Sequence, residues 1–524
     1  MDRWVEHTVQ ALTKDGFMTH VRPSSVLAWK ATRRRGSLEF TDGIEVRRIW
    51  IAPRRAAVCG LAKRIYFRAG KPDLRPEFAI VGGNRPASVA VGEMLTLITH
   101  ALHLIRVDST PHGNFVALKS ISMDPESARQ VQIGGHACLP ERAGLNGAYR
   151  AHGFDMVPEG FSITVIPTDG VSTEFASDIC TRLGRAASQR HAKLATRVTT
   201  CAAAMARAAH ITTTGTQRRA GTCALLLLKT KTAEPHPDAV QLMRCLDGAV
   251  IPYRRAYADD PVDFSVPDQL PSLLLACGGR PHRVNLEHRG QRVWMLGLDL
   301  GHPTEGEQST LVATLIAPDG ALFATGIATQ RRDETMCATA LAKVVNNCLR
   351  TLPDGALLHT GLVVLRDGRM FERDSIAVLR EVCKCPITLL EVRKGHNPLA
   401  MQGGNGSDEN LVPGPFACQV PGEQTLFLNT CLPKSSSMLP SMLKVTWSDH
   451  ANDLHFDATS IAKLLTASSA APSLGLHPHH LPAGLYWADG IAGRSESDLR
   501  FWGVRGVGER PTLPSAECVH PDAP

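Results

Sequence analysis

The stretch VVLRDGR, residues 363–369, ends an apolar run with a charged pair and a glycine. Because Asp-Gly after a β-rich run is one of the commonest turn signals, a hairpin or loop turn is the simplest interpretation. Asp299 ends the run WMLGLDLG, residues 294–301, in much the same way. Two acids therefore occupy segments that otherwise have the composition of a buried core, and their pairing favours a functional site over a turn.

Two ionised carboxylates on neighbouring buried strands need a partner. Burying one such charge is costly unless it is paired or binds a cation. Two of them side by side repel and raise each other's pKa unless a divalent metal lies between them. Hard cations such as Mg²⁺ and Mn²⁺ prefer oxygen ligands. Asp299 and Asp367 thus predict a metal site of the kind found in ribonuclease-H-like nucleases, where two metals activate water and stabilise the leaving oxygen.

The sequence around these acids predicts an α/β fold. Three strand-like runs joined by short turns start at Val293, and a helix near residues 335–349 leads into the strand that ends at Asp367. This order predicts a mixed sheet. From Phe161 the chain alternates apolar runs, such as CALLLLK at 223–229, with helical segments. That βαβα order predicts a second, parallel sheet with helices on its faces.

Composition restricts the class of protein. The chain has 524 residues, which is enough for several domains, and a formal net charge of +7 that suits a polyanionic partner. Its fourteen cysteines include no CxxC pair, which argues against a structural zinc site and a disulfide scaffold and favours a reducing cytoplasm. No segment approaches the ~20 apolar residues of a membrane span, so we expect a cytoplasmic protein with no membrane partner.

At this point four motifs resemble, in order and spacing, the PIWI domain of prokaryotic Argonaute proteins. The resemblance covers about residues 290–500. The motifs are LGLDLGH (296–302), LVVLRDGRMFERD (362–374), LLEVRKGHNP (389–398) and HHLPAGLYWADGIAG (479–493). The set is far more specific than any one motif, and it implies a ribonuclease-H-like nuclease domain.

The resemblance implies a catalytic tetrad. Asp299 and Asp367 would be its first and third members, and Asp489 its fourth, so that these three acids are the expected metal ligands. Glu334, with Asp333 as its neighbour, lies in the interval where the family carries a mobile glutamate. Each has a structural alternative, since Asp489 could be a solvent-facing or capping acid and Glu334 a first-turn acid favoured by the helix dipole.

Residues implied to bind the guide are less well matched. Arg393 and Lys394 correspond to an arginine-lysine strand that contacts the nucleic-acid backbone. Residues 147–167 and 236–255 resemble the Rossmann-like MID domain, which holds the 5′ end of a guide. Arg244 stands where the family has a lysine and could hold phosphate through its planar fork. Tyr253 or Arg254 lies near the family's glutamine.

Two family positions are not filled. Val240 replaces the tyrosine, and a last lysine is missing near residues 274–284. The choice between a 5′ phosphate and a 5′ hydroxyl guide therefore stays open. We predict an N-like or linker region without a PAZ domain at 1–150, because ~150 residues cannot hold two domains of ~100 residues each. A MID domain follows at 151–288 and a PIWI domain at 289–524.

The function implied is that of a guide-directed endonuclease with a two-metal Mg²⁺ or Mn²⁺ site. It would bind a short DNA or RNA guide and cut a complementary target, DNA being favoured, in host defence against invading DNA. The alternative is a catalytically inactive guide-binding sensor that recruits a partner effector protein. A guide-free nuclease with the same sheet is a third hypothesis, against which the MID-like half argues.

Overall fold

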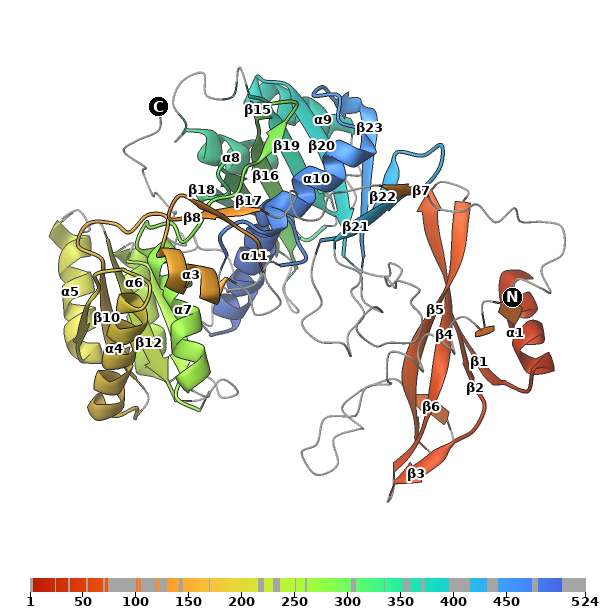
Figure 1. The fold of residues 1–524 in the computed structure, drawn as a ribbon, viewed down its shortest axis with the longest axis horizontal. Helices are drawn as coiled ribbons and strands as arrows, with labels where there is room; N and C mark the ends of the chain where they lie inside the picture. Colours follow the sequence, from red (N-terminus) through yellow and green to blue (C-terminus); the bar gives the residue numbers. More distant parts are fainter. Residues whose placement is uncertain are drawn as a thin grey trace. The chain divides into compact units, whose positions relative to one another are not determined.

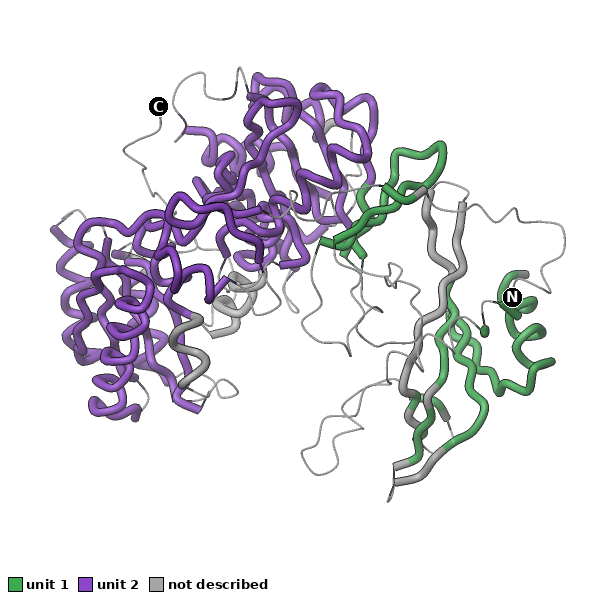
Figure 2. The backbone as a smooth tube through the Cα atoms, viewed as in Figure 1, with its two compact units in different colours: residues 1–122, 394–445 green, residues 123–393, 446–524 purple. Residues whose placement is uncertain are grey.

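The structure is a computed structural model that divides into two compact units (Figure 2). Unit 1 comprises residues 1–122 and 394–445, and unit 2 comprises residues 123–393 and 446–524. The structure describes residues 3–501 apart from 24, 36–37, 53–54, 69–70, 74–99, 102, 105–118, 122–129, 141–144, 169, 215–220, 230–235, 250, 260–261, 303–307, 334, 351, 353–356, 358–359, 369–372, 395–414, 431–441 and 474–478. Among these residues no helix is long and apolar enough to cross a membrane.

The first half of unit 2 is a parallel sheet of four strands in the order β11-β10-β12-β13 (Figure 1). Its elements are β10 (Ser162–Pro167), α4 (Thr173–Ser188), β11 (Ala195–Val198), α5 (Cys201–Thr214), β12 (Thr222–Leu228), α6 (Pro237–Gly248), β13 (Tyr253–Tyr257) and α7 (Val262–Ala276). β12 reads as a continuous apolar run because helices cover both faces of a parallel sheet. Ile166, Leu226 and Leu242 form part of the core under α5 and α6.

The second half of unit 2 contains consecutive strands of a larger mixed sheet, in the order β18-β17-β16-β19-β20. Its strands are β16 (Trp294–Gly301), β17 (Gln308–Ile316), β18 (Leu322–Arg331), β19 (Leu362–Asp367) and β20 (Ile387–Arg393). The first three pair antiparallel, whereas β16, β19 and β20 run parallel. Its helices are α8 (Ala338–Leu349), α9 (Arg373–Cys383), α10 (Ala458–Ser469) and α11 (Ala483–Phe501), and β23 (Leu443–Asn452) precedes α10. The predicted α/β fold with a mixed sheet is confirmed.

The two faces of β16 meet different helices. Leu296, Leu298 and Leu300 are buried in a core shared with α8 and α9. The residues between them, Gly297, Asp299 and Gly301, point to the opposite face because side chains alternate along a strand. This alternation turns Asp299 away from the main apolar core.

Unit 1 contains an antiparallel sheet and the helix α1 (Arg3–Lys14). Its strand order is β1-β2-β4-β5-β6, with β3 paired to β4. The strands are β1 (Met18–Arg22), β2 (Ser25–Trp29), β3 (Arg33–Arg35), β4 (Leu38–Ala52), β5 (Arg55–Arg68) and β6 (Lys71–Asp73). Outside this sheet, β21 (Phe416–Gln419) pairs antiparallel with β22 (Thr425–Asn429) and with β7 (Lys119–Ile121). The boundaries predicted at residues 150 and 288 stay predictions, because both halves of unit 2 belong to one unit.

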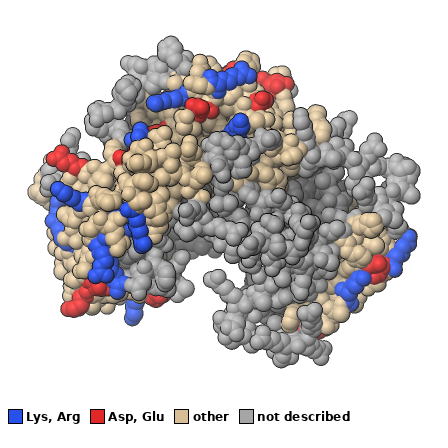
Figure 3. Space-filling view, in the orientation of Figure 1, with Lys and Arg blue, Asp and Glu red and all other residues tan. Residues whose placement is uncertain are grey.

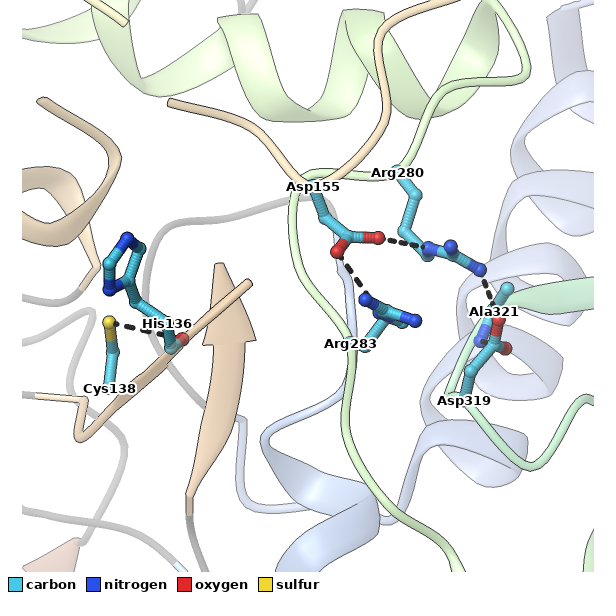
Figure 4. A network of polar contacts seen from close by, with 7 residues as sticks. All are labelled: His136, Cys138, Asp155, Arg280, Arg283, Asp319 and Ala321. Carbon is cyan, nitrogen blue, oxygen red and sulfur yellow. Dashed lines mark hydrogen bonds and ion pairs between the residues drawn. The ribbon is translucent and has the colours of Figure 1, made fainter. Parts of the chain in front are cut away.

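An ion network around the buried carboxylate of Asp155 joins the two halves of unit 2 (Figure 4). Asp155 follows α3 (Asn146–His152), and its side chain is only 3% exposed. It accepts hydrogen bonds from Nε of Arg280 at 2.6 Å and from Nε of Arg283 at 3.0 Å. Arg280 also pairs with Asp319, in the turn between β17 and β18. The segment after α7 is thereby tied to the mixed sheet.

A buried histidine adds a further contact between the same two halves of unit 2. Nε2 of His282 lies 2.8 Å from the carbonyl oxygen of Ala470, just after α10, and Nδ1 lies 2.6 Å from the hydroxyl of Tyr149. A carbonyl only accepts, so Nε2 carries the proton and Nδ1 accepts from the tyrosine. Burial lowers the pKa of His282 to about 4, which keeps the ring neutral.

Candidate active site

Three aspartates meet near the carboxyl-terminal ends of two neighbouring interior strands of the mixed sheet. Asp299 comes from β16, Asp367 is the last residue of β19, and Asp489 lies in α11. Each offers one carboxylate oxygen, and these oxygens all lie within 4.8 Å of one another. Asp299 is buried, Asp367 is half-buried and Asp489 is exposed. The cluster is therefore anchored in the sheet and open to solvent at its outer side.

Strand register brings the first two acids together. In the parallel ladder of β16 and β19, Leu298 lies opposite Arg366, so Asp299 and Asp367 follow at the same level. Gly368 comes next with a φ of +84°, and its N–H donates to the carbonyl of Val392 at 2.8 Å. The turn expected from Asp-Gly is thus present, and the acid at its start still belongs to the cluster. A hairpin is not formed, because β19 leads on to α9.

A close helix–strand contact brings in the third acid. A Cβ on Gly297 would lie 2.2 Å from the carbonyl carbon and oxygen of Gly484, so only glycine fits there. One turn further along α11, Ala488 is fully buried against Val312. Asp489 follows Ala488 directly and reaches the cluster from the helix side.

The donor set fits a divalent cation. Three carboxylates in this space concentrate negative charge that a cation can neutralise, and hard oxygen donors suit Mg²⁺ or Mn²⁺. Asp299 is held in one orientation, because its Oδ1 accepts the N–H of Leu300 at 2.8 Å. Asp299, Asp367 and Asp489 would hold the ion, as the resemblance implied.

Gln330, near the end of β18, holds the segment that leads from this strand to α8. Glu334 lies outside the described residues, but its neighbours do not. Nε2 of Gln330 donates to the carbonyl of Thr335 at 2.5 Å, and its Oε1 accepts the N–H of Cys337 at 2.9 Å. Asp333, the other candidate acid, accepts the N–H of Thr335 at 3.1 Å and so stabilises the turn before α8.

A cavity of about 620 Å³ lies beside this segment, with Arg331, Lys343 and Ser375 in its lining. Cys337 borders it at the start of α8 and is exposed. The Thr339 hydroxyl, 3.0 Å from Sγ, and the first backbone N–H groups of α8 lower the pKa of the Cys337 thiol. The start of α8 is therefore a polar, electropositive corner of the mixed sheet.

The predicted guide-binding residues occupy varied environments. Arg244 is exposed on α6, whereas Tyr253 is buried in the core under α5 and α6. Arg254 is half-buried on β13. Arg393 ends β20 and Lys394 follows it, both half-buried. Their roles in guide binding stay predictions.

Charges on the parallel-sheet half are mixed in sign. On the face drawn in Figure 3, Lys and Arg side chains lie over the α4 and α5 region, with Asp and Glu among them. Arg197 of β11 donates from Nε to the hydroxyl of Thr164 at 3.0 Å, and burial together with nearby Arg207 lowers its pKa. Arg197 on the edge strand β11 and Arg207 on α5 thus lie close enough together to repel each other.

Sequence reasoning missed the residues that support the site. Gln330, Thr314 and His282 carry no motif, and their partners are distant in the sequence. One usable signal was present. Small residues at 484, 488 and 492 recur every four positions, which is typical of a helix face that packs closely against another element.

Comparisons with known proteins bear on the fold. No protein-family model and no curated protein matches the sequence. Solved structures do match. Among them are Kluyveromyces polysporus Argonaute with a guide RNA (TM-score 0.67, 9% identity, 97% of this chain and 80% of that one), Clostridium butyricum Argonaute bound to a guide DNA and a target DNA (0.62, 13%, 84% and 64%), and Marinitoga piezophila Argonaute with a 5′ OH guide RNA and target DNA (0.59, 10%, 92% and 84%). Drosophila Piwi is also similar, at a TM-score of 0.58.

Proposed function

We propose that this chain, an Argonaute-like protein by its fold, is a guide-directed endonuclease that cleaves a complementary nucleic acid by divalent-metal hydrolysis. The observation that carries the proposal is the convergence of Asp299, Asp367 and Asp489 within 4.8 Å. Three such acids on an Argonaute-like sheet are costly to keep unless they bind cations. The resemblance to prokaryotic Argonautes supports DNA as the target and a role in host defence.

The protein's own residues would prepare the site for the reaction. Bound Mg²⁺ or Mn²⁺ ions would supply an activated water and stabilise the leaving oxygen. Asp299 keeps a fixed orientation through the Leu300 N–H, and Asp489 leaves the outer side accessible to a phosphodiester. Glu334 would complete the tetrad from the segment that Gln330 fastens.

The guide would be held by the parallel-sheet half. Arg244, Tyr253 and Arg254 lie on α6 and β13, where the MID resemblance places the 5′ end, and Arg393 and Lys394 would contact the backbone. Such contacts position a strand, and sequence is then read by base pairing. Bound guides in the similar Argonaute structures support a short oligonucleotide as the partner.

A cleavage assay, with a variant of one expected metal ligand as the control, tests the proposal. The full chain is incubated with Mn²⁺, DNA or RNA guides bearing either 5′ end, and labelled complementary targets. We expect one cut at a position fixed by the guide, which Asp299→Asn abolishes. Guide binding without a cut under every combination would favour the non-catalytic sensor instead.

A further inference from the structure

The face of the mixed sheet that meets α11 is a ladder of cross-strand pairs. β16 and β17 pair antiparallel, so the inward residues of β16 each have a direct partner on β17. Along the face the pairs are Gly297–Thr314, Asp299–Val312 and Gly301–Thr310. In the first pair the only side chain is that of Thr314, with its hydroxyl and methyl groups. The second pair contains Asp299 of the carboxylate cluster.

α11 places one small residue on each step of this ladder. A Cβ on Gly484 would lie 2.9 Å from the backbone nitrogen of Gly297. Ala488 packs with Val312. At the third step, a Cβ on Gly301 would lie 3.1 Å from the Cβ of Ala492. The helix therefore runs along β16 in the direction of the strand.

The two spacings match closely enough to hold this register. Four helical residues advance about 6 Å, and two strand residues advance about 6.7 Å. Each helix turn therefore meets one pair of the ladder. Because Asp489 follows Ala488, it lies at the step that Asp299 occupies. A slip of one residue would rotate the helix by about 100° and carry the Asp489 carboxylate away from Asp299.

The first step carries a hydrogen bond that joins the face to the helix backbone. Oγ1 of Thr314 donates to the carbonyl of Gly484 at 2.7 Å, and Thr314 is fully buried. A buried bond of this kind is directional, whereas contacts among alanines tolerate sliding. Gly297 lets the helix backbone approach closely enough for the bond to form.

We propose that Thr314 and Gly484 are positioning residues for Asp489: their bond, made possible by Gly297, sets the register and depth of α11 and so completes the metal-binding carboxylate cluster. The effect on cleavage rests on the proposed nuclease function. The effect on metal binding does not, because it requires only that the three carboxylates bind a cation together.

The test compares Mn²⁺ affinity, measured by electron paramagnetic resonance titration, in the full-length protein and four variants. Thr314→Val removes the hydroxyl at nearly constant volume, and Thr314→Ser restores it. Gly484→Ala pushes the helix outward, and Gly490→Ala adds the same methyl group on the same helix where nothing lies within 4 Å. Circular dichroism and thermal unfolding verify that each variant folds.

We expect Thr314→Val and Gly484→Ala to weaken Mn²⁺ binding by about tenfold, as loss of a supporting contact behind a metal ligand does. Thr314→Ser and Gly490→Ala should bind like the unmodified protein. Unchanged affinity in a folded Thr314→Val protein would overturn the inference, and so would failure of that variant to fold, since the hydroxyl would then be structural. If Gly484→Ala does not fold, Thr314→Val decides.

The same titration separates this inference from the nuclease proposal. If the unmodified protein binds Mn²⁺ and the variants weaken it as expected, but no guide directs a cut, the nuclease proposal fails and the positioning role stands. If the unmodified protein cleaves and Thr314→Val binds Mn²⁺ and cleaves equally well, the positioning role alone fails. If the unmodified protein binds no Mn²⁺, both are overturned.

Discussion

The carboxylates of Asp299 and Asp489 come within 4.8 Å of each other, although one extends from a strand and the other from a helix near the end of the described chain. Asp367 lies equally close. Such proximity of like charges opposes folding unless something binds between them. On the proposed function, the carboxylate cluster lowers the stability of the fold and in return provides affinity for a cation.

Asp489→Asn tests both the cost in stability and the affinity for a cation. Because Asp489 is exposed and repelled by two neighbours, the variant should unfold at a slightly higher temperature than the unmodified protein in a chelating buffer. It should lose the stabilisation by Mn²⁺, which for a site at a hundredfold excess over Kd is about 2.7 kcal/mol. Thermal unfolding with and without Mn²⁺ measures both effects. Asp178→Asn on exposed α4 is the control, and an identical Mn²⁺ response in Asp489→Asn would contradict the cluster.

Gln330→Ala should loosen the segment that contains Glu334. Its side chain bonds to the backbone of Thr335 and Cys337, so the variant frees both groups. Loss of a buried acceptor of this kind costs about 1 kcal/mol, which corresponds to several-fold faster exchange. Hydrogen exchange of the Cys337 amide measures the change, with Gln308→Ala at the exposed start of β17 as the control. Unchanged exchange would show that Gln330 does not hold the segment.

His282 predicts a pH dependence of stability. Its pKa falls from 6.5 to about 4 in the folded protein. Between these pH values the histidine therefore binds a proton in the unfolded chain but not in the folded one. The neutral ring's contribution is fully present above about pH 6.5 and is lost as the pH falls toward about 4, by about 3 kcal/mol in total. Urea unfolding at several pH values should show a weaker acid destabilisation in His282→Gln.

The matched control for that series is His210→Gln, which removes an exposed histidine of α5. It should keep the acid destabilisation of the unmodified protein. A His282→Gln protein with the same pH profile as the control would rule out His282 as the buried neutral group.

Asp155→Asn should destabilise the joint between the halves of unit 2. The substitution leaves Arg280 and Arg283 beside a neutral amide, and breaking a buried pair in this way costs about 3 kcal/mol. Arg283→Gln should cost less than 1 kcal/mol, because that arginine side chain is 40% exposed. The urea unfolding midpoints of the two full-length variants are compared. Equal losses of stability would contradict the central role of Asp155.

The sequence predicted the sheet and two of its acids well, for a physical reason. Asp299 and Asp367 interrupt apolar runs, and a charge at the end of a buried strand stands out against its neighbours. Strand order then follows from short connections and helical crossovers. The mixed sheet predicted from these features is confirmed, with an antiparallel pair β16–β17 and a parallel pair β16–β19.

The supporting residues could not be predicted in the same way. Asp489 was identified through the family resemblance, since nothing in the composition of α11 singles it out. Thr314, Gln330 and His282 act through hydrogen bonds to backbone atoms, and a backbone acceptor has no sequence signature. Their partners become apparent only once the register of strands and helices is known.

Guide-dependent cleavage in Mn²⁺ tests the central claim most directly. The full-length protein is compared with Asp299→Asn and with Asp178→Asn, using a labelled target and a matched or scrambled guide. We predict a single cut that moves with the guide sequence, is lost in Asp299→Asn and is retained in Asp178→Asn. Cleavage that is indifferent to the guide, or that survives in Asp299→Asn, would contradict the account.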